Sequence, residues 1–235
     1  MRAFVITLSG NKESFEQADV LVDSSNHFQN DFDVEKSIAT TPENVVEAFL
    51  AEKIQWNYPW TQEVIDLQTG LKKTPYETAD PKKRMACFMS HYRLWKKCAE
   101  DNEALIVLEH DAMFIRKLNV DLQRETSYDV VSLNDPRGAT RKAALYDELI
   151  QMNHHDKHVV TVPWIDDYNT PQGLPGNSAY YITPRGAEKL LSLVKEYGAW
   201  PNDAIMNKQL MPRMLGCLKN YATVVQKSHN SSTTK

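Results

Sequence analysis

Short apolar runs that end in polar residues alternate with helical patterns along this chain, and this alternation constrains the fold more than any other feature. Strands are predicted at residues 3–8, 18–25, 104–108, 128–133, 179–182 and 221–226, where runs rich in Val, Ile, Leu or Tyr are bounded by turn residues. Helices are predicted after Thr41-Pro42, after Asp80-Pro81, after Thr183-Pro184 and over residues 137–152. The pattern predicts an α/β fold, with a mainly parallel sheet and helices on both faces.

The clearest helix is the one that begins after Asp80 and Pro81. Apolar side chains recur there at steps of three and four residues, and Asp followed by Pro is a typical helix start. Residues 55–79, by contrast, carry Pro, Gly and few periodic apolar positions, which predicts a long loop or lid. The polar residues 227–235 are expected to form a mobile tail. We therefore expect one domain over residues 1–235.

The composition excludes several classes of protein. The chain has 235 residues, with 27 Lys and Arg against 31 Asp and Glu, a net charge of −4 and a mean hydropathy of −0.52. No apolar run approaches the ~20 residues that cross a bilayer, and the acidic balance argues against a protein that coats nucleic acid. Three widely spaced cysteines indicate neither a disulfide framework nor a Cys-rich zinc site. The first apolar run is too short for a signal peptide, so a cytoplasmic location is expected.

Two carboxylates follow the apolar run at residues 104–108. Glu109 and Asp111 are two positions apart, and side chains at such positions of an extended segment project to the same side. Ligands of open α/β sheets collect at the carboxyl ends of strands, and oxygen donors suit Mg²⁺ or Mn²⁺ carrying a diphosphate. A charged turn after a strand is the alternative, and these two residues alone favour that interpretation.

Six strings occur in a fixed order along nearly the whole chain. They are VITL at 5–8, ACFMSHYRLWKK at 86–97, LEHD at 108–111, GNSAYYITPRGAEKLL at 176–191, PND at 201–203, and Gln226 with the Ser-rich segment after it. Together they resemble glycosyltransferase family 25, the lipopolysaccharide and collagen sugar transferases. The chain departs from the family at His110, where an aspartate is usual, and it lacks the usual Arg after the first strand, which leaves Lys12 as the nearby cation. Residues 23–79 match poorly.

This resemblance implies a GT-A-like, Rossmann-like fold with a nucleotide-sugar donor bound above the carboxyl ends of the strands. UDP is the expected nucleotide. The residues expected along the donor are Leu8, Ser9, Ser90, Glu109 and Asn134.

The same resemblance implies a metal site and a catalytic base. Asp111 would bind Mn²⁺ (or Mg²⁺) directly, Glu109 would face the ribose or a water in the metal shell, and His229 would complete the site; a tail residue without a metal role explains His229 equally well. Transfer with inversion needs one base to take the proton of the acceptor hydroxyl. Asp203 is the predicted base, and a carboxylate that merely suits the positive end of a helix is its alternative.

The predicted function is therefore an inverting, metal-dependent glycosyltransferase. It would move a sugar from a nucleotide-sugar to a hydroxyl of a saccharide such as lipopolysaccharide or another surface glycan. One alternative is a nucleotide-sugar or glycan-binding module that lost catalysis through His110, and another is a transferase acting on a modified nucleic-acid base. The expected partners are the nucleotide-sugar and the saccharide, without stable nucleic-acid binding and without a transmembrane segment.

Three further features have structural and functional interpretations. His91 lies off the apolar stripe of its helix, so a packing hydrogen bond and a donor contact are equally supported. The aromatic residues of WNYPW, at 56–60, are candidates for stacking on acceptor sugars, although packing of at least one ring is favoured. The histidines at 154, 155 and 158 predict a solvated loop rather than a metal site.

Overall fold

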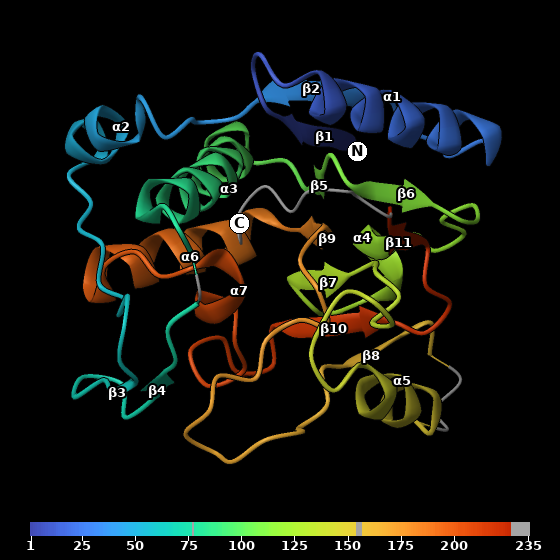
Figure 1. Cartoon of the computed structure of the whole chain (residues 1–235). Helices are drawn as coiled ribbons and strands as arrows, with labels where there is room; N and C mark the ends of the chain where they lie inside the picture. Colours follow the sequence, from blue (N-terminus) through green and yellow to red (C-terminus); the bar gives the residue numbers. More distant parts are fainter. Residues whose placement is uncertain (77, 154–156, 227–235) are drawn as a thin grey trace.

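The computed structural model describes residues 1–76, 78–153 and 157–226. Within them, a seven-stranded sheet has the order β2-β1-β5-β9-β7-β10-β8 (Figure 1). Its strands are β1 (Arg2–Thr7), β2 (Val34–Ile38), β5 (Leu105–Glu109), β7 (Val130–Ser132), β8 (Val159–Thr161), β9 (Ala179–Ile182) and β10 (Leu215–Leu218). β1 pairs in parallel with β2 and β5, and β7 pairs in parallel with β10, whereas β9 and β8 run antiparallel to their neighbours. Most strands of the sheet therefore share one direction.

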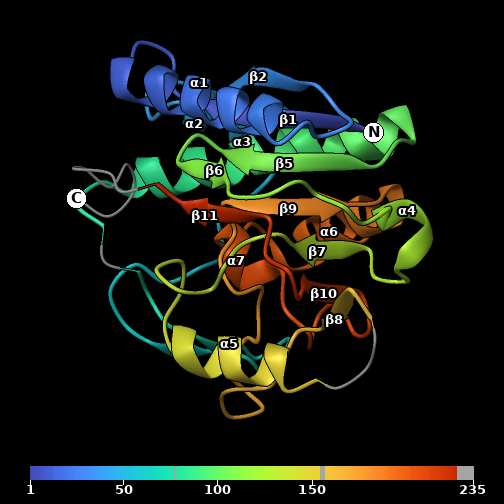
Figure 2. The same cartoon turned by 90° about the vertical axis from the view of Figure 1, so that its right-hand side faces the viewer.

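Helices cover both faces of this sheet (Figure 2). The helix α1 (Lys12–His27) lies on one face, and α3 (Pro81–Asp101) and α6 (Pro184–Tyr197) lie on the other. The remaining helices are α2 (Val45–Glu52), α4 (Leu122–Glu125), α5 (Ala143–Gln151) and α7 (Asn202–Ile205). Two small antiparallel sheets join β6 (Ala112–Phe114) to β11 (Thr223–Val225) and β3 (Val64–Ile65) to β4 (Lys72–Lys73). The predicted α/β class, mainly parallel with helices on both faces, is confirmed.

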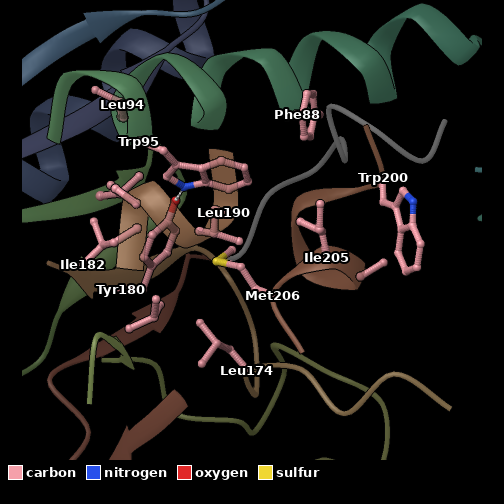
Figure 3. Close-up of a cluster of buried hydrophobic side chains, with 14 of the residues drawn as sticks. Phe88, Leu94, Trp95, Leu174, Tyr180, Ile182, Leu190, Trp200, Ile205 and Met206 are labelled. Atoms are coloured by element: carbon pink, nitrogen blue, oxygen red, sulfur yellow. Dashed lines mark hydrogen bonds between the residues drawn. The ribbon is translucent and has the colours of Figure 1, made fainter. Parts of the chain in front are cut away.

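The strands divide their side chains between two hydrophobic cores. On β5, Leu105 and Val107 pack on the side of α3 and α6, and Ile106 and Leu108 pack on the side of α1. This alternation is the period of two that a strand imposes. In the first core, Trp95 on α3 points toward Tyr180 on β9 and donates a 2.8 Å hydrogen bond to its hydroxyl (Figure 3). The bond fixes α3 on the central strands.

The prediction of a strand at residues 18–25 is wrong, because these residues belong to α1. The buried positions of this helix are Ser14, Ala18, Leu21 and Ser25, spaced by four, three and four residues. That spacing is helical. Small polar side chains occupy half of these buried positions, so the helical period is hidden and only the short apolar run is conspicuous.

Three other predicted elements differ in their limits. The helix expected after Thr41 begins at Val45, because the Asn44 side chain accepts a hydrogen bond from the Thr41 backbone N–H and holds a turn before the helix. The helix expected at 137–152 is α5, which begins at Ala143 after Lys142 in the left-handed conformation. The predicted loop at 55–79 contains β3 and β4. The predicted mobile tail, 227–235, lies outside the described residues.

The pairing of strands brings distant parts of the sequence to one edge of the sheet. β1 and β5 end there, and because β9 is antiparallel to β5, Ala179 at the start of β9 lies opposite Leu108 near the end of β5. Side chains that follow β1 and β5 therefore meet those that precede β9. In the described part of the chain, no helix has the length and apolar character needed to cross a membrane.

Candidate functional site

A cavity of about 890 Å³ lies at this edge of the sheet. Its wall combines the loop after β1, the start of α1, α3, the turn after β5, the segment before β9 and the start of α7. The cavity therefore occupies the place where ligands of open α/β sheets collect. Five residues predicted for donor, metal or catalysis line it, namely Leu8, Ser90, Glu109, Asp111 and Asp203.

Glu109 and Asp111 are held by the backbone at the end of β5. The Glu109 N–H donates to the carbonyl of Ser178 at 2.7 Å, and the Asp111 carbonyl accepts from the N–H of Gln226 at 2.6 Å. The Gln226 side chain also donates to the carbonyls of His110 and Ala112, at 3.3 and 2.8 Å. Gln226, which follows β11, therefore binds the backbone of the acidic turn formed by residues 109–111. The side-chain amide of a Gln supplies the donors for these bonds.

The two carboxylates have opposite electrostatic environments. Burial and then the charge of Glu109 raise the pKa of Asp111 to about 7, and its Oδ1 atom is buried without a hydrogen-bond partner. Burial acts to raise the pKa of Glu109 as well, but the hydrogen bond from His91 and the positive charge near it, including that of Arg84, lower this pKa below its usual value. Glu109 is therefore the ionised member of the pair, and Asp111 is the member that needs a cation or a proton.

His91 links Glu109 to the hydrophobic core. Its Nε2 lies 3.0 Å from Glu109 Oε1, and its Nδ1 lies 2.9 Å from the Tyr180 hydroxyl, which also accepts from Trp95. Because the indole N–H of Trp95 is only a donor, the chain of bonds is satisfied when Tyr180 donates to Nδ1 and Nε2–H donates to Glu109. His91 thus positions the carboxylate of Glu109, and the packing interpretation of His91 is the one that these contacts support.

His110 also lines the cavity, beside the two carboxylates. Its ring hydrogen-bonds to the backbone of Ile6 on the neighbouring strand β1. Burial lowers the pKa of His110, against the charge of Glu109 and this hydrogen bond, which raise it. A lowered pKa favours the uncharged ring near neutral pH, so His110 fills the middle position of the acidic motif without adding a positive charge.

Asp203 approaches the cavity from α7. Burial raises its pKa, while Arg84 and a hydrogen bond with Tyr76 act in the opposite direction. One carboxylate oxygen, Oδ1, is buried without a hydrogen-bond partner. A buried carboxylate with a raised pKa and a free oxygen can accept a proton from a bound hydroxyl group.

The other residues predicted along a donor are placed differently. Ser90 lines the cavity, where its hydroxyl donates to the Ala86 carbonyl at 2.8 Å and accepts from Thr40 N–H at 3.0 Å. Ser9 is exposed after Leu8 and is outside the lining. Asn134 is 1% exposed behind the wall, where its amide donates to Thr223 at 2.7 Å and accepts from Ser178 N–H at 3.1 Å. Asn134 therefore supports the segment before β9, and donor contact by Ser9 or Asn134 stays a prediction.

Two sets of side chains are candidates for metal ligands among the described residues. Glu109 and Asp111 offer the oxygen donors that Mn²⁺ and Mg²⁺ prefer, and the unpartnered Oδ1 of Asp111 fits such an ion. Cys87, His91 and Glu109 also bring their ligand atoms within 4.8 Å of one another. Burial and the charge of Glu109, however, raise the pKa of the Cys87 thiol, which disfavours the thiolate that a metal requires. The predicted ligand His229 lies outside the described residues.

Arg84 and Asn177 line the cavity with buried polar atoms that have no partner, and the sequence did not identify them as site residues. Arg84 on α3 is buried with its Nε and Nη2 atoms unpartnered, and both polar atoms of the Asn177 side chain are also buried without partners. The PKKR run at 81–84 shows positive charge at the start of a helix, but nothing in it distinguishes the buried Arg84 from its solvated neighbours. The aromatic loop residue Trp56 packs on Phe49 and Phe88 and stacks on Trp60, outside the cavity.

Comparison with known proteins gives a match to one family model and similarity in fold to several solved structures. Residues 25–206 match the family model described as glycosyltransferase family 25 (LPS biosynthesis protein). No curated protein matches the chain.

Among solved structures, the fold is similar to mouse xyloside xylosyltransferase 1 in its apo form, with 11% identity and a TM-score of 0.44 over 92% of this chain and 84% of that one. It is similar to a glycosyltransferase involved in the glycosylation of the major capsid of PBCV-1, with 9% identity and a TM-score of 0.44 over 99% and 96%. The apo-form glycosyltransferase GlyE of Streptococcus pneumoniae TIGR4 is 11% identical, with a TM-score of 0.39 over 92% of this chain and 44% of that one.

Proposed function

Because the chain belongs to glycosyltransferase family 25 and has the GT-A-like α/β fold that its motifs imply, we propose that it transfers a sugar from a UDP-sugar, with inversion, to a hydroxyl of a saccharide acceptor. The observation that carries this proposal is the gathering of Glu109, Asp111 and Asp203 around one cavity at the carboxyl ends of β1 and β5. Asp203 lies more than 90 positions from Glu109 and Asp111 in the sequence. One cavity thus combines an acidic pair suited to a metal with a separate carboxylate suited to a base.

The donor would lie along the β1 side of the cavity, with its diphosphate facing the acidic turn. Asp111 is the residue proposed to hold Mn²⁺ or Mg²⁺ directly, since its Oδ1 atom has no protein partner. When bound, such an ion neutralises charge on a departing diphosphate. Glu109, fixed by His91 at 3.0 Å, would orient a ribose hydroxyl or a water of the metal shell.

Asp203 is the proposed base. Burial raises its pKa and so strengthens it as a proton acceptor, against the charge of Arg84 and the effect of Tyr76, which lower the pKa. The acceptor hydroxyl would give its proton to the free Oδ1 of Asp203 as its oxygen attacks the anomeric carbon of the donor. An attack from the face opposite the leaving diphosphate inverts the configuration at that carbon.

The acceptor class follows from the family. The family model is described by lipopolysaccharide biosynthesis, and we propose a saccharide such as lipopolysaccharide or another surface glycan as the acceptor. The net charge of −4 does not favour a nucleic-acid acceptor.

The test is release of UDP from a panel of UDP-sugars in the presence of Mn²⁺ and candidate saccharides. The wild-type protein is expected to release UDP and to give a product of inverted anomeric configuration in an NMR spectrum. Asp203→Asn, which keeps the size of the side chain but removes the base, is expected to lower kcat by about 100-fold or more. Asp23→Asn, an exposed carboxylate on α1 outside the cavity, is the matched control and should leave kcat unchanged.

Two results would contradict the proposal. Binding of UDP-sugars without UDP release under any condition would favour the binding-module alternative. A product that retains the anomeric configuration would exclude the single-base mechanism and the role given to Asp203.

A further inference from the structure

Arg84 is a buried cation on the first turn of α3, at the wall of the cavity. Arg84 is 8% exposed, and its Nε and Nη2 atoms have no hydrogen-bond partner. Within the described residues it makes no ion pair, although the ring of Tyr76 lies under its guanidinium at 4.6 Å. The guanidinium is therefore held in place by an aromatic ring while its hydrogen-bonding edge is unmatched.

Two other arginines show what this edge binds in the same protein. Nε and Nη2 form one side of the guanidinium fork, and Arg185 uses this side to bind both carboxylate oxygens of Asp129, at 2.9 and 2.6 Å. Arg137 uses the same side on Asp135, at 2.9 and 2.6 Å. A planar fork of this kind matches the two oxygens of a carboxylate or a phosphate. Arg84 presents the same edge with no carboxylate on it.

A buried cation without a partner destabilises the folded protein, because the lost hydration is not replaced. Arg93, by comparison, is exposed to solvent on the same helix and carries no such cost. An oxyanion that enters the cavity would supply the missing hydrogen bonds. Arg84 is thus suited to a ligand rather than to the stability of the fold.

The position of Arg84 shows which part of the cavity would hold that oxyanion. Arg84 precedes His91 by seven residues, or about 10 Å along the helix, and His91 is the residue that holds Glu109. Tyr76 lies under Arg84, and the charge of Arg84 and then Tyr76 act to lower the pKa of Asp203 against its burial. Arg84 therefore lies near the proposed base, and its charge acts on both Asp203 and Glu109.

We propose that Arg84 binds a carboxylate or phosphate group of the acceptor, so that the acceptor is an anionic saccharide. This inference rests on the proposed function, because Asp203 identifies the acceptor side of the cavity. The anion on Arg84 would fix the acceptor with one of its hydroxyls at Asp203 Oδ1.

The experiment is a titration of the ¹⁵N-labelled protein followed at arginine Nε–H resonances, with the Arg84 signal assigned by its loss in Arg84→Met. Glucuronate and inorganic phosphate are expected to shift this signal in a saturable way, and glucose is not. In Arg84→Met the affinity for glucuronate should fall at least 10-fold, while Arg93→Gln should bind as the wild type does. Saturation with UDP and Mn²⁺ should change the glucuronate affinity by less than 3-fold.

Three outcomes would overturn the proposal. Equal affinity of the wild type and Arg84→Met for glucuronate would show that Arg84 does not bind the anion. Competition between glucuronate and UDP with Mn²⁺ would show that Nε and Nη2 of Arg84 bind the diphosphate of the donor and not the acceptor. Binding of glucose with the same affinity as glucuronate would show that the site does not select an anion. The anion titration needs no donor, so a failure of UDP-sugar binding would contradict the proposed function separately.

Discussion

Glu109 and Asp111 are two residues apart, yet their pKa values shift in opposite directions. Burial acts on both carboxyls, but only Glu109 receives the hydrogen bond from His91. The ionised Glu109 then adds its charge to the burial of Asp111. In the protein without metal, Asp111 is therefore the group that holds a proton as the pH falls below about 7.

This difference predicts a pH-dependent stability for the metal-free protein. Asp111 has a pKa of about 7 in the folded state against 3.8 for the ordinary carboxyl. Between these values the folded protein keeps a proton that the unfolded chain has lost, so stability falls as the pH rises. Below about pH 4 and above about pH 7 the contribution of Asp111 is constant.

Asp111→Asn removes the titrating group and keeps its shape. In the presence of a chelator, the Tm of this variant relative to the wild type should increase from pH 4 to pH 7 and then level off. Thermal melts at unit pH steps measure the difference. A difference that stays flat from pH 4 to pH 8 would show that Asp111 is not buried against a charged Glu109.

At the residue scale, the sequence motifs located much of the site but not its electrostatics. Leu8, Glu109, Asp111 and Asp203 line one cavity, as expected of residues at the ends of strands or the starts of helices at one edge of a sheet, and Ser90 lines it from the middle of α3. The roles assigned to them stay predictions.

Burial and hydrogen bonding across elements could not be predicted from the sequence. The partner of Glu109 is 18 positions away on α3, and the unmatched edge of Arg84 depends on which side of that helix is buried. Asn134, which was expected at the donor, lies behind the wall for the same reason.

At the scale of elements, α6 is fixed to the start of β7 by its first turn. The Thr183 hydroxyl accepts from the Gly186 N–H at 3.1 Å and donates to Asp129 at 2.7 Å, which caps the helix. A side chain at Gly186 would meet the carbonyl oxygen of Asp129 at 2.9 Å. The glycine therefore allows the helix to approach the backbone of the neighbouring strand closely.

Gly186→Ala is predicted to destabilise the protein. Alanine favours a helix by about 1 kcal/mol over glycine, but overpacking against backbone costs roughly 1–3 kcal/mol. We expect a net loss of about 1 kcal/mol, which lowers Tm by roughly 2–4 °C in a domain of this size. Ser192→Ala, at an exposed position of the same helix, should leave Tm the same or raise it slightly. A Tm of Gly186→Ala at or above that of the wild type would contradict the close packing of α6.

Elements with strong local patterns were predictable, and elements without them were not. The helix α3 follows an Asp-Pro start and a long apolar stripe, and Asp80 accepts the capping hydrogen bond from Lys82 N–H at 2.9 Å. The helix α1 lacks such a stripe, because Ser14 and Ser25 occupy its buried face. The core selects small side chains there for close packing on the sheet, and this selection removes the apolar period from the sequence.

At the scale of the whole molecule, the order of strands creates the cavity. β9 lies between β5 and β7 and runs against both, so that the segment before β9 meets the turn after β5. The helices α3 and α7 then bring Arg84 and Asp203 to the opposite wall. The α/β class could be predicted from the alternation of elements, but the reversed strand could not, because a buried strand has the same apolar pattern in either direction.

The central claim is that this cavity binds a nucleotide-sugar through a metal held by Asp111. Thermal stabilisation of the purified protein by a panel of UDP-sugars, with Mn²⁺ and with a chelator, tests the claim most directly. A ligand at 100 times its Kd should stabilise the protein by about 2.7 kcal/mol. We predict that this stabilisation requires Mn²⁺, disappears in Asp111→Asn and persists in Asp23→Asn. The absence of stabilisation by any UDP-sugar in the presence of Mn²⁺, or an equal effect in Asp111→Asn, would contradict the account.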